Sequence, residues 1–542
     1  MIQKLRVHVL CIHLYLYTFI CTYIADIEMN YRLPRASKQT ANELLNYNDA
    51  VYPAGDISED SSIDEQYSSS EDEDSPHSGG NLDSATQPES ATCTPSTSRR
   101  HYRWRKRGNA KFPCTFVTQA FNNDDEEEAI NSGPYAQFKS YVTDDLFAYI
   151  SDQTNMYSVA KSGVSINTTP DEIERLFAIW LYSGLFPAPS YRDYWSPETC
   201  LSCIADLMPV NRYEKLMQNI HMCDNNLMRK RGETGYDPLF KIRRFYDTIR
   251  NKCRSEQQTE FQSIDEQIVP FKGRHIRKQY LPSKPHRWGF KMITRGSSSG
   301  IIFDFILYAG SETELISPRN EFSTVGNAVR SLCLTIPPGT ENVKLFMDNF
   351  YMTLELVLHL KDVLKIQTTG TMRSNRLHDC PLESEKNLKT RGRGSYDEYT
   401  DMNSNVTMIR WLDNRVVTLA STYLDSVPMD TVKRWDSKTK KHIEVRRPHA
   451  IAMYNAHMGG IDLNDMLQSM YQNQRKSRKW YIRILYYLTW IAITNSWLIY
   501  RTYLSESKYT RSRRLFILQK YVRMQPGRTF CKVQDEGKSQ FF

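Results

Sequence analysis

The spacing of apolar residues along the chain changes character near residue 260. From Thr143 to about Arg254, apolar residues recur at the spacing of helices. The clearest helix covers 173–185, because Thr169-Pro170-Asp171-Glu172 before it has the composition of an N-terminal cap. This part of the chain is predicted to be helical, with further helices over 211–222 and 239–253.

Beyond residue 261, short apolar runs separated by turn residues predict β-strands. The runs 288–294 and 301–309 flank Ser297-Ser298-Ser299-Gly300, which predicts a hairpin. Helical spacing returns over 323–333 and 354–364, and a strand-like run follows each. The predicted order is strand (261–269), hairpin, helix, strand (343–347), helix, strand (365–371). This order is typical of an RNase H-like core up to its fifth strand, so the predicted fold class is α/β.

The final helix of such a core is expected soon after residue 371, but the next suitable run begins near Ile461. The segment between them has strand signals of its own at 406–412 and 416–421. It also carries many basic residues: Lys389, Arg391, Arg393, Lys433, Arg434, Lys438, Lys440 and Lys441. We therefore predict a β-containing insertion that interrupts the core.

The N-terminal part lacks the apolar content of a folded domain. Between Gln39 and Ser98 there are 13 acidic residues and no Lys or Arg. Such a segment cannot bury enough apolar surface to fold, so a disordered N-terminal tail is predicted. Outside Gln39–Ser98 the chain has 70 basic and 49 acidic residues, a formal charge of +21. A folded part this basic is typical of a protein with a polyanionic partner, but charge alone leaves a merely soluble surface equally open.

These patterns give an expected division of the 542 residues. The segments are an apolar start (1–28), a disordered acidic, Ser-rich tail with a basic cluster (29–133), a helical domain (134–260), the first part of the core (261–374), the insertion (375–447), the final core helices (448–510) and a basic tail (511–542).

Two apolar runs could be mistaken for membrane or export signals. Lys4 and Arg6 precede the run 7–25, which looks like a secretory signal. We expect residues 1–28 to be a gene-model extension with the natural start at Met29, and a signal-like segment is the alternative. The run 484–500 contains Thr489 and Asn495, so a buried core helix and no membrane association is predicted.

The cysteines favour a reducing compartment. There are 11, an odd number with irregular spacing, unlike the framework of a secreted disulfide-rich domain. Cys200 and Cys203 form one C-x-x-C pair, with His221 and Cys223 downstream. These four could bind zinc, but no second pair repeats the pattern, so we expect no zinc site and small buried residues instead.

Three aspartates lie where a metal-dependent nuclease would place them. Asp265 interrupts one strand-like run, Asp348 ends another, and Asp462 opens a helical run. Asp465 lies three residues after Asp462, so on a helix the two share a face. Carboxylate oxygens are the ligands that Mg²⁺ prefers. The pattern predicts a two-metal site for cutting phosphodiesters, with Asp265, Asp348 and Asp462 catalytic and all four aspartates binding metal.

The sequence around these aspartates resembles the piggyBac transposase family, from Pro134 to about Arg501. The segments that carry the resemblance are Tyr191-Arg192-Asp193-Tyr194-Trp195, His221-Met222-Cys223-Asp224-Asn225, Ile264-Asp265-Glu266-Gln267, Phe271-Lys272-Gly273-Arg274, Met347-Asp348-Asn349-Phe350, Tyr454-Asn455 and Gly459-Gly460-Ile461-Asp462.

The resemblance implies a DDD transposase that acts on double-stranded DNA at TTAA sequences with two Mg²⁺ ions, Mn²⁺ being an alternative. Such an enzyme nicks the transposon ends, forms a hairpin with the freed 3′-hydroxyl, and joins the ends to target DNA. Asp265, Asp348 and Asp462 match the family's catalytic triad, and Asp465 matches a further aspartate that supports the metals. The resemblance also implies a homodimer, with 134–260 as the dimerisation and DNA-binding domain.

Basic clusters supply candidate DNA contacts and a targeting signal. Residues with the spacing of phosphate-binding groups are Lys272, Arg274, Arg475, Lys476, Arg478 and Lys479, with ordinary surface charge as the alternative. A predicted nuclear localisation signal comprises Arg99, Arg100, Arg103, Arg105, Lys106 and Arg107, with a solvated basic linker as the alternative. The expected location is the nucleus.

The chain departs from the family's pattern at its C-terminal end. Many relatives carry a zinc-binding domain rich in Cys and His there, whereas here only Cys531 follows Cys380 and no His follows His457. Two functions therefore remain open. One is a Mg²⁺-dependent transposase, which four retained aspartates favour. The other is a domesticated or truncated nuclear DNA-binding derivative without transposition activity, which the missing zinc ligands favour.

Overall fold

The computed structural model describes residues 101–106, 115–118, 135–282, 284–437, 439–471 and 477–506. All of them belong to one compact unit, Ser70–Phe542. Several sequence predictions fall outside the described residues: the apolar start, most of the tail predicted to be disordered, the basic C-terminal tail, Arg99, Arg100, Arg107, Arg475 and Lys476.

The predicted helical part consists of helices with defined caps. The Thr143 side chain accepts a hydrogen bond from the Leu146 amide, and Thr169 does the same for Glu172, as expected of N-cap residues. The helices predicted over 173–185, 211–222 and 239–253 are thus confirmed, with shifts of a few residues at their ends, as α5 (Pro170–Leu185), α7 (Val210–Asn219) and α8 (Arg243–Ser255). The same part also contains α4 (Asp144–Ser162) and α6 (Ser202–Ala205).

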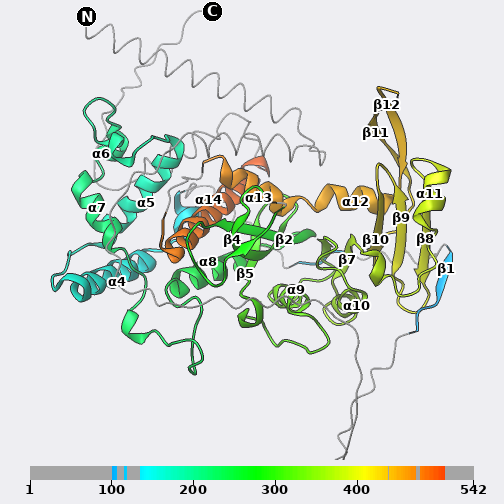
Figure 1. Ribbon diagram of the computed structural model, residues 1–542, viewed down its shortest axis with the longest axis horizontal. Helices are drawn as coiled ribbons and strands as arrows, with labels where there is room; N and C mark the ends of the chain where they lie inside the picture. Colours follow the sequence, from blue (N-terminus) through cyan, green and yellow to red (C-terminus); the bar gives the residue numbers. More distant parts are fainter. Residues whose placement is uncertain are drawn as a thin grey trace, which may run out of the picture. The chain divides into compact units, whose positions relative to one another are not determined.

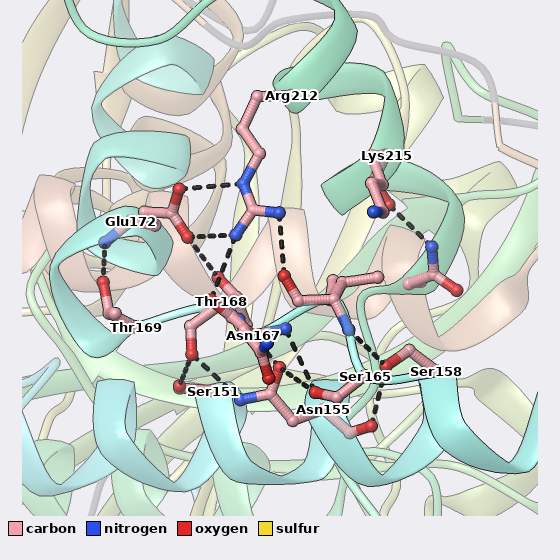
Figure 2. A network of polar contacts seen from close by, with 12 residues as sticks. Ser151, Asn155, Ser158, Ser165, Asn167, Thr168, Thr169, Glu172, Arg212 and Lys215 are labelled. Atoms are coloured by element: carbon pink, nitrogen blue, oxygen red, sulfur yellow. Dashed lines mark hydrogen bonds and ion pairs between the residues drawn. The ribbon is translucent and has the colours of Figure 1, made fainter. Parts of the chain in front are cut away.

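A polar network joins α4, α5 and α7 (Figure 2). From α7, Arg212 donates Nε to Glu172 Oε1 on α5 at 2.8 Å and Nη1 to the Ile166 carbonyl at 2.9 Å. From α4, Asn155 binds both the amide and the carbonyl of Thr168, at 2.8 and 2.9 Å. The connection between α4 and α5 is therefore held by side chains of α4 and α7 (Figure 2).

The central sheet is built around strand β2 (Figure 1). On one side β2 is antiparallel to β4, which is antiparallel to β5; on the other β2 is parallel to β6, which is parallel to β7. The predicted order of strands and helices is confirmed. The elements are β2 (Phe261–Pro270), β3 (Gln279–Tyr280), β4 (Trp288–Ser297), β5 (Ile302–Leu307), α9 (Thr324–Leu334), β6 (Lys344–Met347), α10 (Leu354–Asp362) and β7 (Gln367–Thr371).

The segment predicted as an insertion continues this sheet. β10 pairs antiparallel with β7, from Leu419 opposite Thr371 to Ser421 opposite Thr369, and β9 and β8 follow outward. Pairing covers the β7 edge, whose backbone groups need partners. The elements are α11 (Glu385–Arg391), β8 (Tyr396–Asp401), β9 (Thr407–Leu412), β10 (Val416–Ser421), β11 (Asp430–Asp436) and β12 (Lys441–Arg447), the last two forming a separate two-stranded sheet.

Part of the tail predicted to be disordered is folded. Strand β1 (Trp104–Lys106) pairs antiparallel with β8 at the edge of the sheet. Trp104 Nε1 donates to the His378 carbonyl at 3.2 Å, and Lys106 lies 3.4 Å from Asp397. Val117 forms a further bridge to Glu341. The disorder prediction is wrong for these segments, because an edge strand supplies backbone partners that the local sequence lacks.

The described part of the chain ends with the helices α12 (His449–His457), α13 (Gly460–Ser469) and α14 (Trp480–Glu506). Gly460 lets α13 approach the β4–β5 hairpin, since a Cβ there would lie 2.1 Å from the Ser297 carbonyl oxygen. In α14, Asn495 binds both the amide and the carbonyl of Ile302, at 2.9 and 2.8 Å. The prediction of a buried core helix is confirmed, and none of the helices within the described ranges is long and apolar enough to span a membrane.

Candidate carboxylate site

The two strand aspartates lie side by side because of the sheet register. Ile264 of β2 is opposite Met347 of β6 in a parallel pair, so Asp265 and Asp348 occupy the next positions along the two strands. Parallel strands present their carboxyl ends at the same edge of a sheet, where Asp348 follows the last residue of β6. The register thus brings together two residues that are 83 positions apart.

Helix α13 brings the other two aspartates to this edge. Asp465 Oδ1 accepts hydrogen bonds from Gln267 Nε2 of β2 at 2.7 Å and from the Tyr487 hydroxyl of α14 at 2.9 Å. Gln267 Nε2 also donates to Asn464 Oδ1 at 3.1 Å. These contacts fix α13 against β2 with Asp462 near the same cluster, since Asp462 acts electrostatically on both Asp265 and Asp465.

A lysine that sequence reasoning missed lies among these carboxylates. Lys284 Nζ donates to the Glu266 carbonyl at 2.9 Å and lies 3.8 Å from Asp462 Oδ1. Its side chain is 14% exposed, whereas that of Asp462 is 52% exposed. Lys284 follows β3 in the connection to β4 and lies in none of the motifs that identified the aspartates, so no sequence signal marked it.

The charges of the cluster are not balanced. Part of Asp265 remains accessible, but burial of its carboxyl raises its pKa well above the usual value; Lys284 opposes this, and Glu266 and Asp462 add to it. Burial likewise raises the pKa of Asp465 to about 6. Burial lowers the pKa of Lys284, yet the surrounding carboxylates outweigh burial and raise it overall. The site therefore holds more negative charge than one ammonium group compensates.

Asp348 has partners of its own. Its Oδ1 accepts hydrogen bonds from the Asn349 amide at 2.8 Å and from Thr371 Oγ1 of β7 at 2.7 Å. The Asn349 side chain points to another partner: its Oδ1 accepts a hydrogen bond from Arg373 Nε at 3.3 Å. The next helix, α10, is capped by Thr353.

Glu266, next to Asp265, is a second residue that the prediction passed over. Its Oε2 accepts a hydrogen bond from the Tyr351 hydroxyl at 2.9 Å. Burial raises the pKa of Glu266, but Lys284, Asp265, Lys291 and Tyr351 outweigh that effect and the pKa is lowered. Its place inside the Ile264-Asp265-Glu266-Gln267 motif was the signal that could have identified it.

The donor set suits a hard divalent cation. Carboxylate oxygens are the ligands that Mg²⁺ prefers, and a cation would offset the surplus charge that burial makes costly. Across the described part of the chain, no group of three or more His, Cys, Asp or Glu side chains already stands in a metal-binding arrangement. Asp265 and Asp348 are fixed by strand register, and Asp462 comes from the exposed face of α13.

The other predicted site residues are dispersed. Lys272 and Arg274 are exposed in the connection after β2, and Arg478 is exposed before α14. Lys479 is half-buried and donates to the Gln218 carbonyl at 3.3 Å, so it contacts α7. Of the four residues considered for zinc, the three cysteines, Cys200, Cys203 and Cys223, form no disulfide. His221 Nε2 lies 2.9 Å from Asn225 Oδ1 and 3.6 Å from Cys223 Sγ.

Fold and site together define the class of protein, a mixed α/β chain with helices around a large mixed sheet and carboxylates gathered at its edge. Residues 133–497 match the family model described as Transposase IS4. Because this match covers well over half of the chain, the chain belongs to that transposase family, and its relatives are of the piggyBac type.

Two human proteins illustrate the relationship. PiggyBac transposable element-derived protein 3 is 29% identical over 366 residues, covering 67% of this chain and 60% of that protein. PiggyBac transposable element-derived protein 2 is 26% identical over 374 residues, covering 68% and 61%. The chain thus spans about 60% of the length of these relatives.

A solved structure shares the fold. The piggyBac transposase in a synaptic complex with hairpin DNA, determined by cryo-EM, superposes with a TM-score of 0.60 at 22% sequence identity. The match covers 72% of this chain and 79% of the other.

Proposed function

We propose that this chain is a DDE-type DNA transposase that cuts and joins DNA strands at an RNase H-like core. The observation that carries the proposal is the register of β2 and β6, which places Asp265 beside Asp348 while α13 brings Asp462 to the same edge. The strand order β5-β4-β2-β6-β7, with only the β2–β6 and β6–β7 pairs parallel, supports an RNase H-like core.

Asp265, Asp348 and Asp462 would hold two divalent cations, Mg²⁺ or Mn²⁺. When bound, such ions activate the attacking water or 3′-hydroxyl and stabilise the leaving oxygen. The protein's part is to fix the ligands: Thr371 and the Asn349 amide hold Asp348, and strand pairing holds Asp265. Asp465 would support the metal ligands by holding α13 in place, because its Oδ1 accepts hydrogen bonds from Gln267 of β2 and Tyr487 of α14.

DNA is the proposed substrate, with transposon ends and TTAA target sites. Membership of a transposase family and a fold shared with a transposase solved with hairpin DNA support this. Exposed Lys272, Arg274 and Arg478 would neutralise phosphates, a contact that positions DNA without reading its sequence. A homodimer is proposed on the family resemblance.

A cleavage assay tests the proposal. The full chain is incubated with TTAA-flanked inverted-repeat DNA and Mg²⁺, and nicked and hairpin products are resolved on denaturing gels. We expect products from the parent chain and at least a roughly thousandfold loss in Asp265→Asn, Asp348→Asn and Asp462→Asn. Asp171→Asn, which changes an exposed helix pair, is the control and should cleave normally.

The second candidate is a DNA-binding derivative without transposition activity. The names of the human relatives, which call them transposable element-derived proteins, favour it. The same DNA distinguishes the two: a gel shift without nicking by the unmutated chain, in Mg²⁺ and in Mn²⁺, would replace the enzyme with the binding protein.

A nuclear location is part of the proposal. Arg103 and Arg105 are exposed beside β8 and remain candidates for the targeting signal with Lys106. A fluorescent fusion of the full chain should accumulate in nuclei. Replacement of Arg99, Arg100, Arg103, Arg105, Lys106 and Arg107 by alanine should abolish that accumulation.

A further inference from the structure

Lys284 occupies an unusual position for a lysine. Its side chain is 14% exposed, and the ammonium group is held by the Glu266 carbonyl at 2.9 Å, one residue after Asp265. A buried ammonium costs solvation free energy unless opposite charges compensate it. Here the nearest ionic partner is Asp462 at 3.8 Å, a residue from a helix 178 positions further along the chain.

Among the described residues, the charged groups that act most strongly on Lys284 belong to the carboxylate site or border it. Asp265, Asp462, Glu266 and Asp465 all act on its charge, in that order of strength. The other nearby cation, Lys291 of β4, lies over the Phe350 ring at 4.0 Å and interacts mainly with Glu266. The ammonium group of Lys284 therefore interacts electrostatically with the carboxylates of β2 and with those of α13.

We propose that Lys284 is a built-in counter-charge, a positioning residue that holds Asp265 and Asp462 together in the metal-free protein and competes with divalent cations for them. This inference rests on the proposed function, since it concerns the same site. The Glu266 carbonyl accepts a hydrogen bond from the ammonium, and this contact holds the ammonium beside the carboxylates of β2.

Two consequences follow from a competing internal cation. Removing it should let the carboxylates bind a divalent ion more tightly, because the ion no longer displaces an ammonium group from them. Removing it should also destabilise the metal-free protein, because the carboxylates then repel each other without compensation. A residue that merely packed beside the site would produce the second effect without the first.

The test measures thermal unfolding midpoints of the full chain across Mn²⁺ and Mg²⁺ concentrations, without DNA. Ligands that bind only the folded state raise the midpoint by mass action. In Lys284→Met, the concentration that gives half of the metal-induced rise should fall about tenfold, while Lys284→Arg should stay near the parent. Lys278→Met is the matched control, because Lys278 lies directly before β3, near Lys284 in the sequence, but contacts Gly273 and the Trp288 ring.

A double-mutant cycle with Asp462→Asn measures the metal-free effect. Lys284→Met should lower the metal-free midpoint in the parent and lower it less in Asp462→Asn. An unchanged or higher half-maximal metal concentration in Lys284→Met, or equal losses in both backgrounds, would overturn the inference. Should Lys284→Met not fold, Lys284→Gln takes its place in both measurements.

The outcomes separate this inference from the proposed function. A parent chain with no metal-induced rise, but with coupling between Lys284 and Asp462, overturns the competition with divalent cations and keeps only the metal-free pairing. The DNA cleavage assay then decides the proposed function separately. A metal-induced rise and DNA cleavage in the parent, with no shift in metal affinity for Lys284→Met, keeps the transposase and removes the counter-charge.

Discussion

Two buried acidic centres in this protein differ in how their charge is compensated. Asp304 of β5 is fully buried, and Arg250 Nε donates to its Oδ1 at 2.7 Å. Thr335 Oγ1 donates to Oδ2 at 2.7 Å, and Arg254 Nε lies 3.1 Å from Oδ2. One carboxylate thus has two arginines and a hydroxyl, joining α8 to the sheet.

The aspartate site has the opposite balance. Asp265, Asp462 and Asp465 lie around the ammonium group of Lys284, and Lys291 also acts on Asp265, but among the described residues no arginine pairs with these three carboxylates. Both centres connect helices to the same sheet. The comparison indicates that Asp304 is satisfied by the fold alone, whereas the aspartate site leaves negative charge for a cation from outside.

The largest expected effect is at the compensated centre. Asp304→Ala leaves Arg250 and Arg254 without their shared partner, and an uncompensated buried charge costs about 3–5 kcal/mol of stability. Urea unfolding followed by circular dichroism measures the loss. Asp430→Ala, which breaks an exposed pair with Arg447, should cost less than about 1 kcal/mol. Equal losses in the two variants would contradict the comparison.

A smaller loss is expected from the support of Asp465. Tyr487→Phe removes the hydroxyl that donates to Asp465 at 2.9 Å, and a hydrogen bond to a charged group contributes about 1.5–3 kcal/mol. The same unfolding assay measures it, and DNA cleavage should fall as well. Tyr500→Phe changes a tyrosine of the same helix away from the aspartates and is the control. Unchanged stability in Tyr487→Phe would mean that Gln267 alone holds Asp465.

The under-compensated centre should respond to charge removal in the opposite direction. Asp265→Asn keeps the shape of the side chain but removes a carboxylate whose pKa burial raises. We expect the metal-free protein to gain about 1 kcal/mol of stability, as sites built for function often do when neutralised. Calorimetry in the presence of a chelator measures the change. A clear loss of stability would show that this site, like Asp304, is compensated by the fold.

The smallest effect concerns the partly exposed pair in Figure 2. The hydrogen bonds from Arg212 are the main cause of the lowered pKa of Glu172. A carboxylate with a depressed pKa adds stability above its unfolded pKa, about 4.3, and this stability is lost as pH falls through the folded value.

Unfolding midpoints measured from pH 7 to pH 3 test this prediction. Arg212→Met should lower the midpoint at pH 7, where solvent screening limits the pair to about 1 kcal/mol. The difference from the parent should shrink toward pH 3 to the part contributed by the hydrogen bond to the Ile166 carbonyl, which does not titrate. A difference that persists undiminished at pH 3 would assign it to packing of Arg212 rather than to its charge.

Much of the local structure could be predicted from the sequence. The caps at Thr143 and Thr169, the hairpin at Ser297–Gly300 and the succession of helices and strands depend on residues a few positions apart, so their signals are local. The aspartates could be found for the same reason, because each lies at the end of a strand-like run or the start of a helical one.

Only the tertiary structure decided how these pieces meet. The pairing of β10 with β7 and of β1 with β8 depends on free sheet edges, which leave no pattern in the paired segments. Gln267 binds Asp465 across 198 positions, and Lys284 reaches Asp462 across 178. The sequence by itself determined the elements and the carboxylates. Packing decided which cation stands among them, because charge balance in a buried site depends on distance in space rather than along the chain.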